Sequence, residues 1–293
     1  NKVGFIGVGI MGKSMVRNLM KAGFELHIYA RTKSKVEDVI SEGAQFHESI
    51  KDCVQDCDAV ITIVGFPQDV EEVYFDEGNI LDSAKKGAYL IDMTTTSPQI
   101  AEKIYEEGTK RGFHVMDAPV TGGDTGAKAG TLSILVGGEK EDYEACMPLF
   151  EAMGTNINYQ GKAGCGQHCK LANQIMIAGT LSGVCEALTY AKEQGLDPEV
   201  FMKSVATGAA GSKQLDTFGP KILKDDYAPG LFMKHFIKDM KLALIEANRK
   251  GLSLDVLSMV LANYEELEQE GYGDLGTQAL MKFYDEEHRN TEE

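Results

Sequence analysis

Three glycines near the start of the chain, Gly7, Gly9 and Gly12, constrain the fold more than any other feature of the sequence. They follow the strand-like segment Val3 to Gly7 and open the segment Ile10 to Ala22, whose apolar residues recur at helical spacing. Between a strand and a helix, the first glycine permits a tight turn and the second lets the backbone approach a pyrophosphate closely. The third allows the helix to pack on the strand. The pattern therefore predicts a dinucleotide-binding unit.

The start of the predicted helix, at Ile10 and Met11, is expected to hold the phosphates of the dinucleotide. The end of the next predicted strand, Leu26 to Ala30, distinguishes the two nicotinamide cofactors, because an acidic residue there binds a ribose 2′-hydroxyl and repels a 2′-phosphate. No acid stands there, and Arg31 and Thr32 follow instead, with two lysines just beyond. A guanidinium and a hydroxyl suit a phosphate. We expect NADP(H), with NAD(H) as the alternative.

The first part of the chain alternates short apolar segments with helix-like stretches, the pattern of βα units around a parallel sheet. Several segments are apolar throughout, as in strands that helices cover on both faces. We expect strands at Val3 to Gly7, Leu26 to Ala30, Ala59 to Val64, Tyr89 to Asp92, His114 to Asp117, Leu132 to Val136 and Ile157 to Gln160. Helices are expected at Ile10 to Ala22, Ser34 to Glu42 and Gln99 to Arg111. Residues 1–162 are the predicted cofactor-binding domain.

Residues 163–293 have a different pattern, in which apolar residues recur at helical spacing and no strand is expected. The predicted helices are Gln167 to Gln194, Pro198 to Ala206, Met233 to Arg249 and Leu254 to Glu268. The tail, Asp285 to Glu293, is acidic and polar and is expected to be a solvated end. The sequence therefore predicts an α/β domain followed by an all-α domain.

The acidic composition restricts the partners of this chain. Its 29 Lys and Arg residues face 45 Asp and Glu residues, a net charge of −16, and such a surface repels phosphate backbones and anionic lipids. No uninterrupted apolar run approaches the roughly 20 residues of a membrane span, and no secretory signal precedes the first strand. We expect a cytoplasmic protein without nucleic-acid or membrane partners.

Four segments resemble, in order, the motifs of the β-hydroxyacid dehydrogenases, the family of 3-hydroxyisobutyrate dehydrogenase, tartronate semialdehyde reductase and the glyoxylate/succinic semialdehyde reductases. The segments are Phe5 to Leu19, Asp117 to Gly123, Gly164 to Asn173 and Lys238 to Ala243. The resemblance covers essentially the whole chain. It implies a Rossmann-like domain linked by a long helix to an all-α domain that carries substrate and oligomer contacts, with a homodimer or a homotetramer as the assembly.

The same resemblance makes Lys170 the catalytic acid/base and Asn173 its neighbour at the substrate. Their i, i+3 spacing agrees, since such positions share one face of a helix. An ammonium beside a carbonyl oxygen can stabilise and protonate it during reduction. For the reverse direction the pKa of Lys170 must fall toward neutrality, through desolvation or a nearby positive charge such as Lys238.

The segment Thr121-Gly122-Gly123 follows a strand and a proline, so a hydroxyl and glycine N–H groups are free to converge on an anion. The resemblance implies that this loop holds the substrate carboxylate. Relatives usually have serine where Thr121 stands, and the extra methyl group could narrow the pocket. A tight turn is the alternative role of Gly123.

Further residues take their roles only from the resemblance. Thr95 is implied to lie near the nicotinamide, and the turn Val64-Gly65-Phe66 is implied to border the adenosine ribose, unless it is a simple turn. Lys238 and Asp239 are adjacent and cannot share a helix face, so Lys238 is expected toward the nicotinamide and Asp239 toward the substrate or a structural partner. Phe232 either walls the substrate pocket or belongs to the core.

The cysteines and histidines predict no metal site. The nearest approach to a ligand set, Cys165, His168 and Cys169, lacks the second pair of ligands that zinc sites have. The thiols are expected to be reduced. The cysteines are Cys53, Cys57, Cys146, Cys165, Cys169 and Cys185, and the other histidines are His27, His47, His114, His235 and His288.

The expected reaction is hydride transfer between NADP(H) and a short carboxylate-bearing aldehyde or its β- or γ-hydroxyacid, with glyoxylate or succinic semialdehyde as the first choice. An NAD-linked 3-hydroxyisobutyrate dehydrogenase is the alternative within the family. A non-catalytic nucleotide-binding scaffold and an imine reductase are alternatives from other classes, and the lysine at position 170 argues against both. A flavin enzyme is a further alternative, which a colourless protein would exclude.

Overall fold

In the computed structural model, which describes residues 1–285, the chain divides into two compact units, Asn1–Lys170 and Leu171–Glu293. Apart from Asp285, the acidic tail and His288 lie outside the described residues. The division falls inside the longest helix, α10 (Cys165–Glu193), rather than near residue 162, because the start of α10 is hydrogen-bonded to Asp117 of the first unit.

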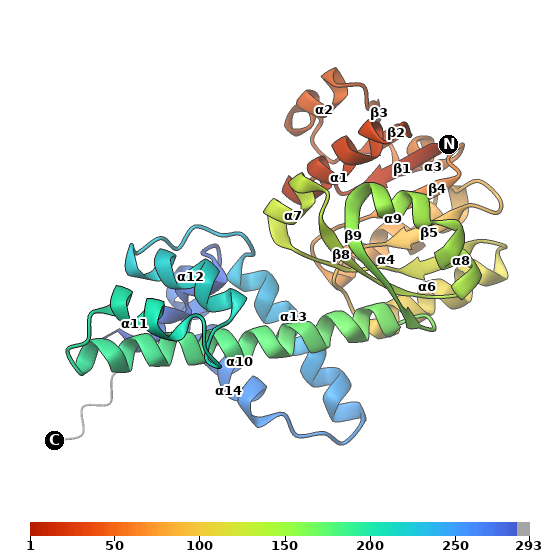
Figure 1. Ribbon diagram of the computed structural model, residues 1–293. Helices are drawn as coiled ribbons and strands as arrows, with labels where there is room; N and C mark the ends of the chain where they lie inside the picture. The colour runs from red at the N-terminus through yellow and green to blue at the C-terminus, as the bar shows by residue number, and fades with distance from the viewer. Residues whose placement is uncertain (286–293) are drawn as a thin grey trace. The chain divides into compact units, whose positions relative to one another are not determined.

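The first unit is built on a sheet whose strand order is β3-β2-β1-β4-β5-β6-β8-β7, with β9 beside β8 (Figure 1). The strands from β3 to β6 are parallel, whereas β8 runs antiparallel to β6 and β7 and parallel to β9. Their bounds are β1 Lys2–Ile6, β2 Glu25–Tyr29, β3 Gln45–His47, β4 Ala59–Thr62, β5 Tyr89–Asp92, β6 His114–Asp117, β7 Val120–Thr121, β8 Leu132–Gly137 and β9 Gly154–Gly161.

Helices cover both faces of this sheet. Successive side chains of a strand point to opposite faces of the sheet, and in β1 and β5 both faces are apolar. Phe5 and Ile91 belong to one core with Leu19 of α1, while Ile6 and Leu90 belong to a second core. The helices of the unit are α1 Ile10–Lys21, α2 Glu37–Ser41, α3 Ile50–Val54, α4 Pro67–Phe75, α5 Ile80–Ser83, α6 Pro98–Lys110, α7 Gly123–Ala129, α8 Lys140–Ala145 and α9 Met147–Met153, with a 3₁₀ turn, η1, at Lys33–Lys35.

The order of the parallel strands locates the binding edge. From β1 the chain first runs outward to β2 and β3 and then returns to β4 on the other side of β1. In open α/β sheets, ligands bind at such a reversal point, at the carboxyl ends of the strands. The predicted α/β fold is confirmed, and its glycine loop lies at this point.

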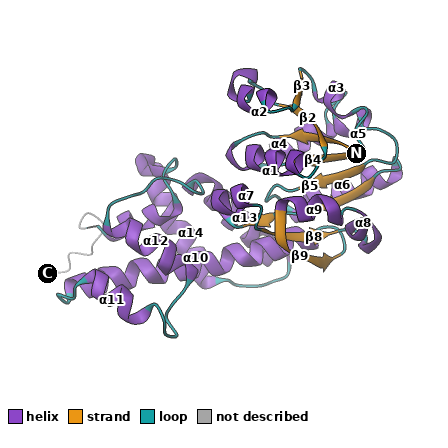
Figure 2. Cartoon of the chain, turned by 45° about the horizontal axis from the view of Figure 1, so that its top comes forward, coloured by secondary structure: helices purple, strands orange, loops and turns teal. Residues whose placement is uncertain are grey.

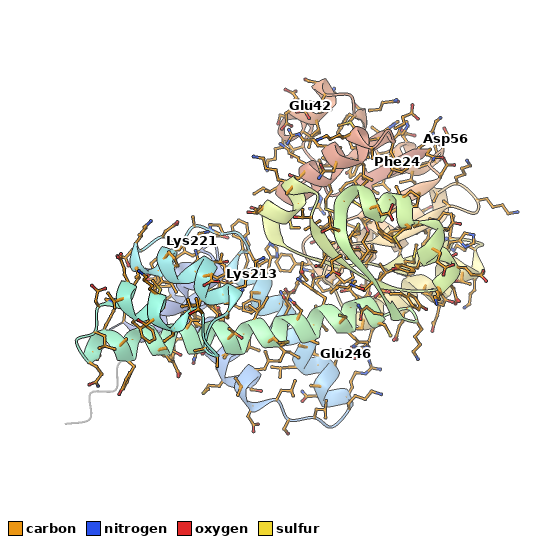
Figure 3. All side chains as sticks on the ribbon, in the orientation of Figure 1. Phe24, Glu42, Asp56, Lys213, Lys221 and Glu246 are labelled. Carbon is orange, nitrogen blue, oxygen red and sulfur yellow. The ribbon has the colours of Figure 1, made fainter. Side chains whose placement is uncertain are left out.

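The described part of the second unit consists of helices joined by loops (purple and teal in Figure 2), with one isolated β-bridge between Phe232 and Gly276. It holds most of α10 together with α11 Pro198–Val205, α12 Lys213–Leu223, α13 Met233–Arg249, α14 Asp255–Leu267, a π-helical turn at Glu268–Tyr272 and a 3₁₀ helix at Thr277–Tyr284. One core, which includes Phe236 and Tyr264, packs α10, α13 and α14 together. Figure 3 labels Lys213 and Lys221 on α12 and Glu246 on α13.

Some expectations need correction. The helix expected over residues 34–42 is instead two elements, η1 and the short α2. They are separated by Val36, whose side chain is buried in the core of the first unit. The short strands β3 and β7 were not predicted, because each has too few residues to show a period. Helix α12 was not predicted either, and it contains Gly219 and Pro220, two residues that usually interrupt a helix. Within the described residues, one helix, α10, is long and apolar enough to cross a membrane. Buried core helices of other proteins have the same length and mean hydropathy, so this finding is weak evidence for a membrane span.

Candidate active site

The glycine loop joins β1 to α1 by close backbone contacts. Gly7 has φ +96°, and a Cβ there would lie 2.0 Å from the carbonyl oxygen of Ile63. A Cβ on Gly12 would lie 2.3 Å from the Gly7 carbonyl oxygen, whereas a Cβ on Gly9 would meet nothing within 4 Å. Glycine is therefore required by packing at the first and third positions, while the second borders open space into which a ligand fits.

Helix α1 presents unbonded N–H groups beside that open space. Its first intrahelical hydrogen bond runs from Lys13 N to Gly9 O at 2.8 Å, so the N–H groups of Ile10, Met11 and Gly12 have no partner within the helix. The first turn contains no acidic residue. A helix of this length favours an anion at its N-terminus, and the loop thus fits a dinucleotide pyrophosphate.

Arg31 and Thr32 follow β2 on the same edge of the sheet. The Arg31 side chain is 73% exposed, and its Nη2 lies 3.8 Å from Asp69 Oδ1 and 3.5 Å from Glu72 Oε2 on α4. Exposed pairs at these distances are weak. Thr32 is exposed, and its hydroxyl does not cap η1. Both side chains therefore remain available to a phosphate group.

The turn after β4 is held by the loop after β5. Val64 N donates to Thr94 Oγ1 at 2.9 Å, and Phe66 N donates to Asp69 Oδ2 at 2.9 Å at the start of α4. The predicted residues Val64, Gly65 and Phe66 thus lie at the same edge as the glycine loop and next to the loop that carries Thr95.

Asp92, at the end of β5, is a buried carboxylate that no motif in the sequence singled out. Its Oδ1 accepts hydrogen bonds from Thr62 Oγ1 at 2.9 Å and from Thr94 N at 3.2 Å, and Tyr74 shares a hydrogen bond with Thr62 at 2.8 Å. Burial raises the pKa of Asp92 to about 6, against the effect of these hydrogen bonds. The only signal in the sequence was an acid at the carboxyl end of an apolar strand.

Asp117, at the end of β6, anchors the first turn of α10. Its two carboxylate oxygens accept hydrogen bonds from the backbone N–H groups of Gly164 and Gln167, both at 2.9 Å. Burial raises the pKa of Asp117, and these two N–H groups act in the opposite direction. A carboxylate at this end of a helix also complements the helix dipole.

Lys170 is buried in the second turn of α10, with 8% of its surface exposed. It is the last residue of the first unit and stands three positions after Gln167 on the same helix. Gln167 itself is fully buried and hydrogen-bonds to the backbone on either side of Thr95. The structure thus links the predicted proton donor and the predicted nicotinamide contact through one intervening residue.

The predicted carboxylate loop lies between β7 and α7. Gly122 and Gly123 both have positive φ, +127° and +62°, and a Cβ on Gly123 would meet nothing within 4 Å. Thr121 is half-buried and pairs with Ser133 of β8. Both glycines are exposed, and glycine adopts these backbone conformations without strain, so the loop can turn here with room for a ligand beside its backbone.

The remaining predicted residues belong to the second unit, where they form a chain of polar contacts. Asn173 Nδ2 donates to Gln174 Oε1 at 2.9 Å, and Gln174 Nε2 donates to Asp239 Oδ2 at 2.8 Å. Lys238 Nζ lies 3.1 Å from Asp239 Oδ1. The ends of these two adjacent side chains meet because the long lysine side chain folds back to the neighbouring carboxylate, and the roles expected for Lys238 and Asp239 stay predictions.

Phe232 caps the start of α13. Its ring meets His235 edge to face, and Lys234 Nζ lies 5.3 Å from the ring centroid. These contacts leave both the pocket and the core interpretation of Phe232 as predictions. In residues 1–285, no group of three or more His, Cys, Asp and Glu side chains could hold a metal ion.

Two family models match the chain. The NAD binding domain of 6-phosphogluconate dehydrogenase matches residues 2–161, and the NAD-binding domain of NADP-dependent 3-hydroxyisobutyrate dehydrogenase matches residues 164–284. Together they span almost the whole chain, and the first alone covers more than half of it. The glycine loop, in which a Cβ on Gly9 would meet nothing within 4 Å, lies within the residues that the first family model matches.

Relatives resemble the chain over nearly its full length. An uncharacterised oxidoreductase of Bacillus subtilis, YkwC, is 49% identical over 96% of this chain and 98% of its own. A probable 3-hydroxyisobutyrate dehydrogenase-like protein of Arabidopsis thaliana is 44% identical over 96% and 84%. The 2-hydroxy-3-oxopropionate reductase of Escherichia coli is 37% identical over 86% of each chain.

Solved structures agree with this likeness. The 3-hydroxyisobutyrate dehydrogenase of Mycobacterium tuberculosis, solved with L-serine, is 25% identical and superposes with a TM-score of 0.89 over 97% of this chain and 99% of that one. The chain belongs to the β-hydroxyacid dehydrogenase family. It is an NAD(P)-dependent oxidoreductase that acts on hydroxyacids.

Proposed function

We propose that this protein is an NADPH-preferring semialdehyde reductase that uses Lys170 as its general acid and base. The observation that carries the proposal is the setting of Lys170: a buried lysine on the helix whose first turn is bonded to the loop that contains Thr95. A lysine that is buried at such a place is better suited to transferring a proton in a reaction than to carrying charge at the protein surface.

The proposed reaction follows from the residues around that lysine. Bound NADPH supplies a hydride to the carbonyl carbon of the substrate. The ammonium of Lys170 stabilises the negative charge that develops on the carbonyl oxygen and then donates a proton to it. The hydroxyl of Thr121 and the N–H groups of Gly122 and Gly123 hold the substrate carboxylate, and the amide of Asn173 orients the substrate.

The preference for NADPH rests on Arg31 and Thr32. Because Arg31 lies only within weak, exposed pairs with Asp69 and Glu72, a 2′-phosphate can replace these carboxylates as its partner at little cost. The absence of an acid directly after β2 removes the group that would select NADH.

The substrate class is a short aldehyde that bears a carboxylate, with glyoxylate and succinic semialdehyde first. The loop of Gly122 and Gly123 supports the carboxylate, and the reductase activity in the name of the Escherichia coli relative supports the aldehyde. An NAD-linked 3-hydroxyisobutyrate dehydrogenase is the second candidate, favoured by the name of the Mycobacterium tuberculosis structure.

We also propose a homodimer or homotetramer formed through the helical unit. Several large apolar side chains of that unit are exposed, a feature typical of protein interfaces. They include Met176, Tyr190, Val256 and Met259. Light scattering on the purified protein should give a mass of two or four chains, and a monomer at micromolar concentration would contradict the proposal.

The activity is tested by following the absorbance of NADPH and of NADH with glyoxylate, succinic semialdehyde, tartronate semialdehyde and methylmalonate semialdehyde. We expect turnover with NADPH and a loss of kcat of roughly 10²- to 10⁴-fold in Lys170→Ala. The exposed Lys213→Ala serves as the control and should match the wild type. NADPH binding without turnover of any aldehyde would favour a scaffold or an imine reductase.

A further inference from the structure

The side chain of Gln167 holds both ends of the peptide segment around Thr95. Its Oε1 accepts a hydrogen bond from Thr96 N at 2.9 Å, and its Nε2 donates to Thr94 O at 2.7 Å. Gln167 is 0% exposed, and Thr94 and Thr96 are also buried, so no water competes for these bonds. The amide therefore fixes the backbone on either side of Thr95.

The backbone of Gln167 is held equally firmly to the sheet. Its N–H donates to Asp117 Oδ2 at 2.9 Å. Next to it, Gly166 packs so closely that a Cβ there would lie 2.5 Å from Leu135 O and 2.7 Å from Asp117 O. The first turn of α10 thus has one position relative to β6 and β8, and the Gln167 side chain starts from a fixed point.

Lys170 follows Gln167 by three positions in the same helix, and residues at this spacing lie one above the other on one face. Because the helix is hydrogen-bonded along this turn, the distance between these two residues is set by helix geometry. The position of Lys170 relative to the Thr95 segment is therefore determined through Gln167.

We propose that Gln167 is a positioning residue, which holds the Thr94–Thr96 segment and the turn that carries Lys170 in a constant relation. The inference rests on the proposed function, in which Thr95 lies at the nicotinamide and Lys170 transfers the proton. Gln167 touches neither reactant. It aligns hydride donor and proton donor by acting through Thr95 and Lys170, and errors of about 1 Å in such alignment can cost on the order of 100-fold in rate.

An amide meets both demands of this segment at any pH, since it offers one acceptor to Thr96 N and one donor to Thr94 O. Methionine has similar length and apolar volume but makes neither bond. Ionised glutamate accepts from Thr96 N but turns an oxygen toward Thr94 O, whereas protonated glutamate can make both bonds. Gln167→Glu should therefore regain function as the pH falls.

The experiment compares Gln167→Met, Gln167→Glu and a matched control, Gln278→Met, in the full-length protein. Gln278 is also 0% exposed, and its Nε2 donates to Asp226 O at 3.1 Å and Ala228 O at 3.0 Å in the helical unit. Loss of its two backbone bonds should cost similar stability, and no role in the reaction is assigned to it.

For Gln167→Met we expect kcat per folded protein to fall roughly 10- to 100-fold while the KM for NADPH changes less than about threefold. Gln278→Met should keep kcat per folded protein within about twofold, at a comparable loss of Tm. The ratio of kcat in Gln167→Glu to that in the wild type should rise as the pH falls. Equal kcat in the two methionine variants, or a ratio independent of pH, would overturn the proposal.

Hydrogen exchange of the backbone amides separates this inference from the proposed activity, because it needs no substrate. Gln167→Met should raise exchange at residues 94–97, whereas residues 164–168, which Asp117 and the close packing of Gly166 hold to the sheet, should exchange as in the wild type. Gln278→Met should leave both segments unchanged. If the wild type turns over no aldehyde, the proposed function fails, but hydrogen exchange still tests whether Gln167 holds the Thr94–Thr96 segment. Unchanged exchange at residues 94–97 of Gln167→Met would refute the positioning role.

Discussion

Asp92 and Asp117 are register partners on the neighbouring parallel strands β5 and β6, so two buried carboxylates end adjacent strands of the central sheet. Asp92 fixes the backbone that follows its own strand, whereas Asp117 fixes the backbone at the start of α10. Asp92 accepts from Thr94 N, and Asp117 accepts from Gly164 N and Gln167 N at the start of α10. The charge of Asp117 also raises the pKa of Asp92, although burial is the larger cause.

Asp92→Asn should change how stability depends on pH. Burial raises the pKa of Asp92 from 3.8 to about 6, so the folded state binds a proton more tightly than the unfolded chain does. The stabilisation from this proton is present in full below the ordinary pKa and is lost as the pH rises through about 6. The free energy of unfolding of the wild type, relative to Asp92→Asn, should fall by on the order of 3 kcal/mol across that interval.

Denaturant titrations of both proteins from about pH 4 to pH 7 measure this difference. The asparagine side chain in Asp92→Asn keeps the size of the aspartate and an acceptor for Thr94 N. The pKa of Asp117 is raised mainly by burial, which both proteins share, so most of its contribution cancels in the comparison. A difference in unfolding free energy that does not vary with pH would mean that Asp92 ionises normally.

Gly166→Ala should destabilise the protein by about 1 to 3 kcal/mol, since the new methyl group would overlap the carbonyl oxygens of Leu135 and Asp117. Gly183→Ala in the same helix is the control, because a Cβ there would meet nothing within 4 Å. It should be neutral or stabilise by up to about 1 kcal/mol through helix propensity. Chemical denaturation measures the free energy of unfolding of both variants. Equal changes in the two would show that α10 is not closely packed against β6 and β8 at Gly166.

Arg31→Ala should raise the KM for NADPH by roughly 10- to 100-fold, because the variant loses the charge-assisted hydrogen bond that we propose between Arg31 and the 2′-phosphate. The KM for NADH should stay within about twofold. Glu72→Gln removes one carboxylate that faces Arg31 and should lower the KM for NADPH. Steady-state kinetics with both cofactors measures these effects, and parallel changes for NADPH and NADH would exclude Arg31 as the residue that selects the cofactor.

Thr121→Val should raise the KM for the carboxylate-bearing aldehyde by roughly tenfold, since the hydroxyl that we propose as a donor to the carboxylate is replaced by a methyl group of similar size. Thr121→Ser keeps the hydroxyl and should retain the wild-type KM. Neither change should alter the KM for NADPH by more than about twofold. If valine and serine act alike in kinetics with the best aldehyde, the hydroxyl has no part in substrate binding.

Local pattern was enough to predict the elements with a strong period. Strands Tyr89–Asp92 and His114–Asp117 and helix Met233–Arg249 have the bounds expected from the sequence, because apolar runs and helical spacing depend only on neighbouring residues. The glycine loop was predictable for the same reason, as strand, turn and helix are contiguous. Short elements such as β3 and β7 carry too few residues to show a period.

Only the tertiary structure decided the polar network around α10. Gln167 hydrogen-bonds to Thr94 and Thr96, which lie 73 and 71 positions earlier in the chain, and to Asp117, which lies 50 positions earlier. No local spacing encodes such pairs, because the partners meet only when β5, β6 and the first turn of α10 pack together. Lys238 and Asp239 show the same limit at short range, since helix spacing predicts where side chains leave the backbone and not where a long lysine ends. The sequence by itself thus determined the cofactor loop, and its resemblance to the family predicted Lys170 as the proton donor, while packing decided what holds that lysine in position.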